Sequence, residues 1–167
     1  MTATTQIMTE ADTCRELVTP KLVEAGWGNA PHVIGEQRTF TNGRIIVAGG
    51  RVRRGKQRRA DYLLYYRRDY PLAVVEVKEL GLPAETGVQQ AKEYAEILGL
   101  KFAYATNGHR IIEIDYTTGT EREVDRFATP AELWQRLTAA TALPTHICTP
   151  SGPRRETTFH LPSPKAS

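Results

Sequence analysis

The chain has 167 residues, of which 40% are hydrophobic and 25% are charged, and its formal net charge is +3. These values are ordinary for one globular domain that buries a core, and two widely separated cysteines exclude a disulfide framework. The chain contains no recognisable signal peptide and no apolar run near the roughly 20 residues that cross a bilayer, so we expect a cytoplasmic protein without membrane contact.

The first predicted element is a helix over residues 10–25. Residues 9–12, with the sequence TEAD, resemble a capping box, and apolar residues recur behind it at spacings of three and four. Pro20 should kink or divide this helix because proline has no backbone N–H to donate. Gly26 should end it, and Trp27 should fold back onto the core.

A β-hairpin is predicted next, over residues 33–50. Its turn would be the Asn-Gly pair of the segment TNGR, residues 41–44, and its second strand would cover residues 44–48. Residues 49–59 are basic and rich in glycine, so we expect a loop there. Seven Lys or Arg residues and no acid lie between residues 44 and 59. Such a block favours a polyanion as partner, although a solvated loop would explain the same charges.

The rest of the chain alternates strands and helices. Predicted strands cover residues 60–66, 71–78, 101–106 and 110–116, and predicted helices cover residues 86–98 and 129–140. The second of these helices has a strong start in TPAE, residues 129–132, which combines a threonine cap, a proline in the first turn and a glutamate three residues later. The order of elements predicts an α/β fold, in which a mixed β-sheet is flanked by α-helices.

The C-terminal segment differs in composition from the rest. Five of the ten prolines fall in residues 144–167, and no apolar period continues there. We therefore expect one domain over residues 1–143, followed at residues 144–167 by a proline-rich linker or disordered tail.

Two charged residues interrupt the otherwise apolar strand PLAVVEVK. Glu76 and Lys78 lie two residues apart, so they share one face of the strand at a spacing of about 6–7 Å. Asp61 opens the preceding strand, and a hairpin would bring it beside this pair. Two carboxylates and one ammonium leave an excess negative charge, which a Mg²⁺ ion with oxygen ligands would neutralise. A partly buried salt bridge is the structural alternative.

These residues resemble a known signature. Asp61, followed by Glu76-Val77-Lys78, resembles the PD-(D/E)XK motif of nucleases, with alanine in place of the usual proline. Gln90 and Tyr94 on the following helix resemble the Q-x-x-x-Y motif of one nuclease subgroup, although a half-buried tyrosine on a helix surface would look the same. The order of ADYLLYY, PLAVVEVKE, GVQQAKEYAEILGLKFAYATNG and ATPAELWQRL is similar to the N-terminal nuclease domain of the restriction (R) subunit of type I restriction–modification enzymes, over residues 9–140.

The resemblance implies a restriction-endonuclease-like core and a Mg²⁺-dependent endonuclease activity, with Mn²⁺ as a substitute ion. The implied metal ligands are Asp61, Glu76, the backbone carbonyl of Val77 and, from the first helix, Glu10. Glu16 is the alternative to Glu10, and the role of Glu36 stays open. Lys78 would orient the attacking water or stabilise charge on the phosphoryl oxygens, while Gln90 and Tyr94 would position the site or the phosphate backbone.

The implied substrate is double-stranded DNA, and the implied partners are the modification and specificity subunits of the restriction complex. Affinity for DNA phosphates without sequence readout would come from the basic segment, that is from Arg51, Arg53, Arg54, Lys56, Arg58 and Arg59. ATP would act only in motor domains that this chain lacks. The segment GRVRRGK fits the start of a phosphate-binding loop, but Gln57 follows it where Ser or Thr would hold Mg²⁺.

Two other functions fit the same residues. The first is a module that binds DNA or a partner subunit and is inactive in isolation. The second is a repair or mobile-element nuclease of the same fold. The sequence also leaves open whether the chain is a fragment that leads toward a motor or a short stand-alone relative.

Overall fold

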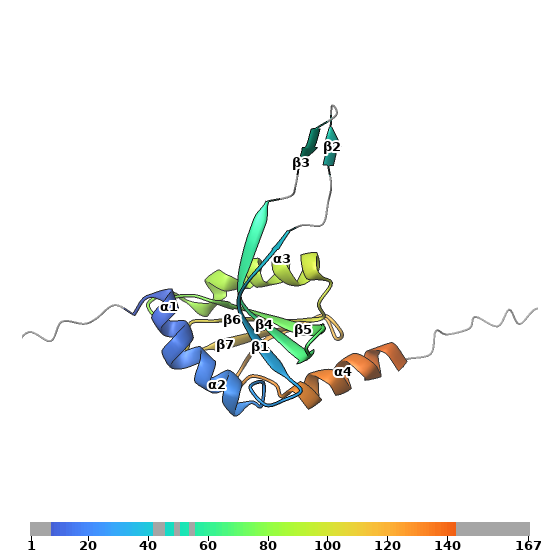
Figure 1. The fold of residues 1–167 in the computed structure, drawn as a ribbon. Helices are drawn as coiled ribbons and strands as arrows, with labels where there is room; N and C mark the ends of the chain where they lie inside the picture. The colour runs from blue at the N-terminus through green and yellow to red at the C-terminus, as the bar shows by residue number, and fades with distance from the viewer. Residues whose placement is uncertain (1–7, 42–45, 49–50, 54–55, 143–167) are drawn as a thin grey trace, which may run out of the picture.

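A computed structural model describes residues 8–41, 46–48, 51–53 and 56–142 of the chain. In this part the protein is a mixed β-sheet with helices on both faces, and a small two-stranded sheet extends from one end of it (Figure 1). No helix in these ranges is both long enough and apolar enough to cross a membrane. The predicted α/β class with a mixed, helix-flanked sheet is confirmed.

The strands are β1 (Val33–Thr41), β2 (Ile46–Ala48), β3 (Arg51–Arg53), β4 (Gln57–Arg67), β5 (Tyr70–Val77), β6 (Phe102–Thr106), β7 (Ile111–Asp115) and β8 (Thr120–Val124). The helical segments are α1 (Glu10–Thr13), a π-helix (Cys14–Val18), α2 (Thr19–Glu24), a 3₁₀ helix (Ala84–Gly87), α3 (Val88–Leu98) and α4 (Pro130–Ala142).

The large sheet has the strand order β1-β4-β5-β6-β7-β8. Its neighbours are antiparallel except for β5 and β6, which are parallel. A parallel pair needs a crossover connection, and the 3₁₀ helix with α3 provides it. Because β5 is central, its C-terminal end lies between β4 and β6, which is where the charged residues of the strand are found.

Both faces of the central sheet are covered. The N-terminal helical segments and α4 pack on one face, where Val18, Leu22 and Leu133 are fully buried. Helix α3 packs on the other face through Ala91 and Ala95. Strands buried on both sides have apolar residues at nearly every position, which explains the continuous hydrocarbon run of β5.

The N-terminal helix follows its sequence closely. The N–H of Asp12 donates to Thr9 Oγ1 and the N–H of Thr9 donates to Asp12 Oδ2, both at 3.2 Å, which completes the capping box. The helix is divided as predicted, with a π-helical turn ahead of Pro20. It ends before Gly26, which has a φ of 96°, and Trp27 is fully buried.

The predicted hairpin over residues 33–50 is wrong. Strand β1 pairs with β4, for example Thr41 opposite Gln57, and β2 pairs with β3 instead. The loop predicted for residues 49–59 is also wrong, because β3 and the start of β4 lie there. The dense positive charge of this segment is incompatible with a buried strand. The strands found here can nevertheless form, because they extend beyond the core and need no buried face. The proposed turn at Asn42-Gly43 lies outside the described residues.

Strand β8 was not predicted from the sequence. Its residues are TEREV, and most of their side chains are exposed because β8 is an edge strand of the sheet. An edge strand with charged side chains has no apolar alternation to detect. The proline-rich tail at residues 144–167 lies outside the described residues, so its assignment stays a prediction.

Candidate active site

Asp61 lies at the point where β4 separates from β5. Their ladder begins with Tyr62 opposite Val75, and the preceding residues of β4 pair with β1 alone. The backbone N–H of Val77 lies beyond the paired region and donates to Asp61 Oδ2 at 2.8 Å. A side-chain carboxylate thus replaces a backbone partner, and it is held against the end of β5.

Glu76 and Lys78 begin a chain of hydrogen bonds that leads to α3. Lys78 Nζ donates to Glu76 Oε1 at 2.9 Å and to Gln90 Oε1 at 3.0 Å. Gln90 Nε2 then donates to the hydroxyl of Tyr94 at 2.8 Å. The structure therefore brings together the residues of the two motifs, which lie on a strand and on a separate helix.

The 3₁₀ helix that precedes α3 covers this pair. A Cβ atom added to Gly87 would lie 3.4 Å from Cγ of Lys78 and 3.5 Å from Cγ of Glu76. The close approach of the backbone leaves Glu76 only 2% exposed, and the side chain of Lys78 is 16% exposed. Both charged groups are therefore largely removed from water.

Burial and mutual repulsion set the ionisation of the site. Burial, followed by the charge of Asp61, raises the pKa of Glu76 to about 7 against the opposing effect of Lys78. Burial also raises the pKa of Asp61, although hydrogen bonds from Val77 and Gln37 lower it. For Lys78, burial lowers the pKa, but its bond to Glu76 and the neighbouring acids outweigh burial, so the net pKa is raised. The site carries more negative charge than its lysine neutralises.

The donor set fits a hard divalent cation. Glu76 Oε2 is buried and has no hydrogen-bond partner, so a good acceptor oxygen beside Asp61 is left unsatisfied. Within the described ranges, no group of three or more His, Cys, Asp or Glu side chains is arranged to hold a metal. The protein would thus offer two carboxylates, and the other positions would be filled by backbone oxygen and water, as is usual for Mg²⁺.

Two acids of the N-terminal helical segments, Glu10 and Glu16, differ in their distance from the site. Glu10 lines a cavity of about 400 Å³ that Asp61 and Glu36 also line. Its pKa is raised by burial and then by the charge of Asp61. Glu16 is exposed and forms an ion pair with Arg15 at 3.4 Å. The geometry therefore favours Glu10 over Glu16 as the acid that belongs to the site.

Sequence reasoning missed Gln37. Its Nε2 donates to Asp61 Oδ1 at 3.2 Å, and it lines the same cavity. No local pattern marks this glutamine. Only the β1–β4 register, which places residue 37 opposite residue 61, could have found it.

The predicted DNA-binding residues divide into three groups. Lys56 and Arg59 are exposed, and Arg59 lines the cavity beside Asp61. Arg58 is half-buried and donates to Glu93 on α3 at 2.9 Å, so it ties β4 to the motif helix. The side chains of Arg51 and Arg53, and all of Arg54, lie outside the described residues.

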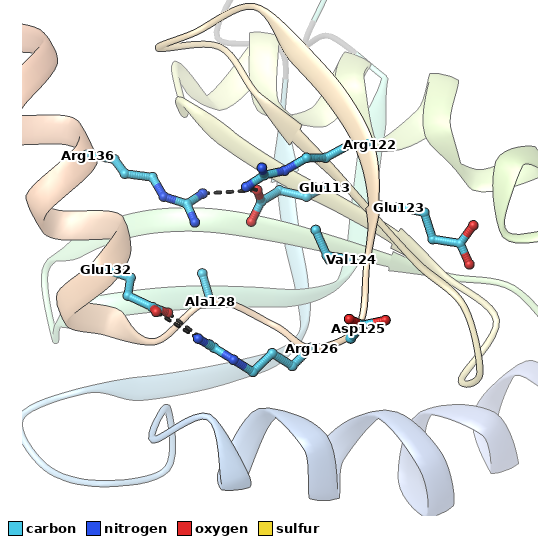
Figure 2. A pocket seen from close by; sticks show the side chains of 9 residues that line it. All are labelled: Glu113, Arg122, Glu123, Val124, Asp125, Arg126, Ala128, Glu132 and Arg136. Atoms are coloured by element: carbon cyan, nitrogen blue, oxygen red, sulfur yellow. Dashed lines mark hydrogen bonds and ion pairs between the residues drawn. The ribbon is translucent and has the colours of Figure 1, made fainter.

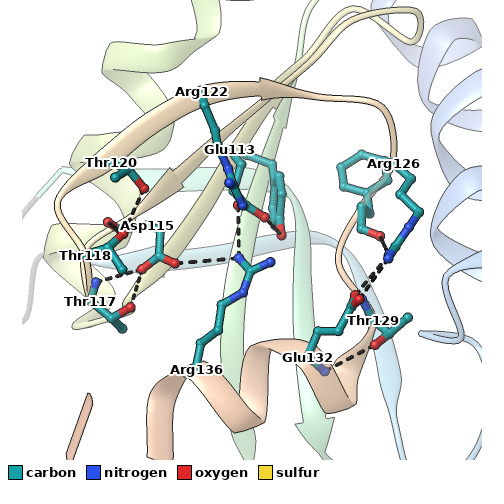
Figure 3. Close-up of polar contacts among 12 residues, drawn as sticks. Glu113, Asp115, Thr117, Thr118, Thr120, Arg122, Arg126, Thr129, Glu132 and Arg136 are labelled. Atoms are coloured by element: carbon teal, nitrogen blue, oxygen red, sulfur yellow. Dashed lines mark hydrogen bonds and ion pairs between the residues drawn. The ribbon is translucent and has the colours of Figure 1, made fainter. Parts of the chain in front are cut away.

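A second cavity, of about 430 Å³, lies between the β7–β8 edge and α4 (Figure 2). Its most buried acid is Glu113, which is 1% exposed and accepts hydrogen bonds from the hydroxyl of Tyr104 at 2.8 Å, from Arg122 at 3.1 Å and from Arg136 at 3.0 Å (Figure 3). The arginine Arg126 at its rim pairs with Glu132. Each of its three arginines is paired with an acid of the cavity, which is the pattern of a structural network.

Comparisons with known proteins point to one family. A family model described as type I restriction enzyme R protein N terminus matches residues 35–127. The chain is 37% identical, over 136 residues, to the type I restriction enzyme EcoAI endonuclease subunit of Escherichia coli, covering 78% of this chain and 17% of that protein. A structure described as a fragment of an HsdR subunit of a type I restriction enzyme from Vibrio vulnificus YJ016 matches with 57% identity and a TM-score of 0.74, covering 84% of this chain and 27% of that chain.

Proposed function

The chain belongs to the family of type I restriction enzyme R protein N termini, and on this premise we propose that it is a Mg²⁺-dependent nuclease domain that hydrolyses phosphodiester bonds of double-stranded DNA. The observation that supports this most is the buried, unpartnered oxygen of Glu76 beside Asp61. A buried carboxylate with only a structural role is expected to have both oxygens hydrogen-bonded, whereas a cation site needs an oxygen that is free to bind the ion.

Asp61, Glu76 and the carbonyl of Val77 would hold the ion directly, and Glu10 would be a further carboxylate at the cavity that Asp61 lines. When bound, Mg²⁺ acidifies a water and polarises a phosphoryl oxygen. Asp61 keeps a fixed place because Val77 donates to it from β5. Glu76 binds Lys78 through one oxygen, and its other, unpartnered oxygen would bind the ion.

Lys78 would act on the reacting phosphate. Its raised pKa keeps the ammonium protonated at neutral pH. An ammonium has three N–H donors, and Lys78 directs two of them at Glu76 and Gln90. The third would donate to the attacking water or to a phosphoryl oxygen as negative charge develops there. Tyr94, through Gln90, fixes the direction in which this third donor points.

Exposed cations near the site would bind the DNA backbone. Arg59 lines the cavity and Lys56 is exposed just before β4 begins, so both would attract phosphates without any reading of bases. Within a restriction complex, the modification and specificity subunits would be the partners, and the target sequence would be read outside this domain. The family match favours this setting over a repair or mobile-element nuclease.

Nicking of a supercoiled plasmid by the full chain tests the proposal. We expect conversion to open circles with Mg²⁺ or Mn²⁺, and none with EDTA. Lys78→Ala should abolish nicking while DNA binding persists. The control is Lys101→Ala, which removes an exposed lysine just before the N-terminal end of β6 and should leave nicking unchanged. Nicking by Lys78→Ala at the wild-type rate would contradict the assignment.

The binding module remains the second candidate for one reason. The chain spans only 17% of the E. coli subunit and 27% of the V. vulnificus fragment to which it is similar. An R subunit domain of this size would then bind DNA or a partner subunit and cut only inside the assembled complex. DNA binding without nicking, even with Mn²⁺, is the result that favours this second function.

A further inference from the structure

Gln37 has an unusual backbone conformation for its position. Its φ is 48°, and among the described residues it is the non-glycine residue with a positive φ. It lies within β1, where an extended backbone is expected. Side chains rarely adopt this region because Cβ approaches the backbone, and such strain persists where the surrounding structure requires it.

The strained residue lies opposite Asp61. Glu36 pairs with Tyr62 and Arg38 pairs with Ala60, so Gln37 lies at the level of Asp61 between these two pairs of the ladder. Gln37 Nε2 donates to Asp61 Oδ1 at 3.2 Å. The other oxygen of Asp61 accepts the N–H of Val77 at 2.8 Å. The carboxylate is thus held on one side from β1 and on the other from β5.

We infer that Gln37 is a positioning residue for Asp61. Its amide restricts rotation of the carboxylate, keeps the bond to Val77 in place and presents Asp61 to a cation in one orientation. The presentation of Asp61 to a cation rests on the proposed function, whereas the restricted rotation and the bond to Val77 concern the protein alone. Gln37 is exposed, so packing in the core does not explain its strained conformation. The hydrogen bond to Asp61 does explain it, which supports this role.

Two variants of Gln37 separate the effect of its side-chain amide from the effect of its backbone strain. Gln37→Ala removes the amide and keeps the strain, whereas Gln37→Gly removes the amide and relieves the strain, since glycine adopts positive φ freely. Gln135→Ala, at an exposed glutamine on α4, is the matched control. All three keep the residues that would bind the metal.

Hydrogen exchange of the Val77 amide, measured by NMR without metal, tests the positioning directly. We expect about threefold to tenfold faster exchange in both Gln37 variants, the size of a weakened hydrogen bond, with no change in Gln135→Ala. The Val75 amide, inside the β4–β5 pairing, should be unchanged in all of them. Wild-type exchange at Val77 in both variants would overturn the inference.

Mn²⁺ titration by calorimetry tests the consequence for the cation. The dissociation constant should rise about threefold to tenfold in both variants, with the melting temperature of Gln37→Gly at or above that of the wild type. Recovery of wild-type exchange and Mn²⁺ affinity in Gln37→Gly would assign the effect to the backbone and overturn the role of the amide. Absence of Mn²⁺ binding in the wild type would count against the proposed function, while the Val77 measurement still decides about Gln37.

Discussion

The sheet carries two buried glutamates that differ in their hydrogen-bond partners and in the charges around them. Glu113 on β7 accepts hydrogen bonds from two arginines and a tyrosine. Glu76 on β5 accepts from one lysine, lies near a second acid and keeps one buried oxygen without a partner. Both are almost fully buried, so exposure does not distinguish them. The difference is in the balance of charge.

This balance indicates what each cluster contributes. A buried carboxylate is costly unless it is paired and hydrogen-bonded, and at Glu113 both conditions are met within the fold. At Glu76 the single bond from Lys78 compensates the cost only in part, and burial together with the charge of Asp61 raises the pKa of the group to about 7. A site that lowers stability in this way is better explained by a ligand that completes it. The two glutamates should therefore respond in opposite ways to substitution.

The largest expected effect is on activity at Glu76. Glu76→Gln removes a carboxylate that we propose binds the ion and thereby stabilises the transition state by several kcal/mol, so cleavage should fall by about 10³-fold. Stability should be unchanged or higher, because the substitution removes a poorly compensated charge. Plasmid nicking and urea denaturation measure the two quantities. A large loss of stability in Glu76→Gln would mean that Glu76 is a structural residue like Glu113.

The second effect is on stability at Glu113. Glu113→Ala removes the acceptor of Arg122 and of the buried Tyr104 hydroxyl and leaves Arg136 paired with Asp115 alone, at 3.6 Å. Because the arginines are partly exposed and can be solvated, we expect a cost of about 2–3 kcal/mol, set mainly by the lost hydrogen bonds. Glu113→Gln, which keeps an acceptor oxygen, should cost less. Urea denaturation measures the loss. The cleavage rate of the remaining folded protein should match the wild type, and a specific loss of activity would contradict the comparison.

The third effect is a pH dependence that belongs to Glu76. Because its pKa is raised from 4.5 to about 7, the folded protein binds this proton more tightly than the unfolded chain does. The contribution to stability is fully present below about pH 4.5 and is lost as pH rises through about 7. With about 1.4 kcal/mol per pKa unit, the metal-free protein should lose up to ~3 kcal/mol, and Asp61 shifts in the same direction.

Denaturation between pH 5 and pH 8 in EDTA checks this slope. Glu76→Gln should flatten it. Mg²⁺ should restore stability at pH 8, because binding to the folded state favours the ionised carboxylates. An equal slope in wild type and Glu76→Gln would show that other groups cause the dependence.

The two clusters also differ in how far the sequence predicts them. The Glu76–Lys78 and Gln90–Tyr94 spacings follow from the periods of a strand and a helix, so local pattern was enough. Glu113 lies in the apolar run IIEID, and its partner Arg136 is 23 residues away on another element. No local period joins these two residues, and the cluster was missed.

The same reasoning explains the errors outside the site. The register of β1 against β4 depends on long-range pairing, so neither Gln37 nor the separate β2–β3 ladder could be derived from neighbouring residues. Glu10 was assigned by resemblance, and the fold places it at the cavity that Asp61 lines. Elements with strong caps or alternation were predicted well, whereas charged strands were mistaken for loops.

The smallest expected effect concerns the helix that carries Arg136 to Glu113. The N–H of Glu132 donates to Thr129 Oγ1 at 3.2 Å, and the N–H of Thr129 donates to Glu132 Oε2 at 2.8 Å, so α4 begins with a capping box. Thr129→Ala should cost about 1 kcal/mol in urea denaturation, and Thr129→Ser should restore most of it. Thr138→Ala, at an exposed threonine that bonds only to carbonyls of its own helix, is the matched control.

Because α4 contacts the Glu113 cluster and not the Glu76 site, Thr129→Ala should leave plasmid nicking and Mn²⁺ affinity unchanged. A loss of Mn²⁺ affinity in this variant would show that the two clusters are coupled through the sheet. The prediction that the Glu113 cluster and the Glu76 site are independent would then be wrong, even if the separate predictions for Glu76 and Glu113 were confirmed.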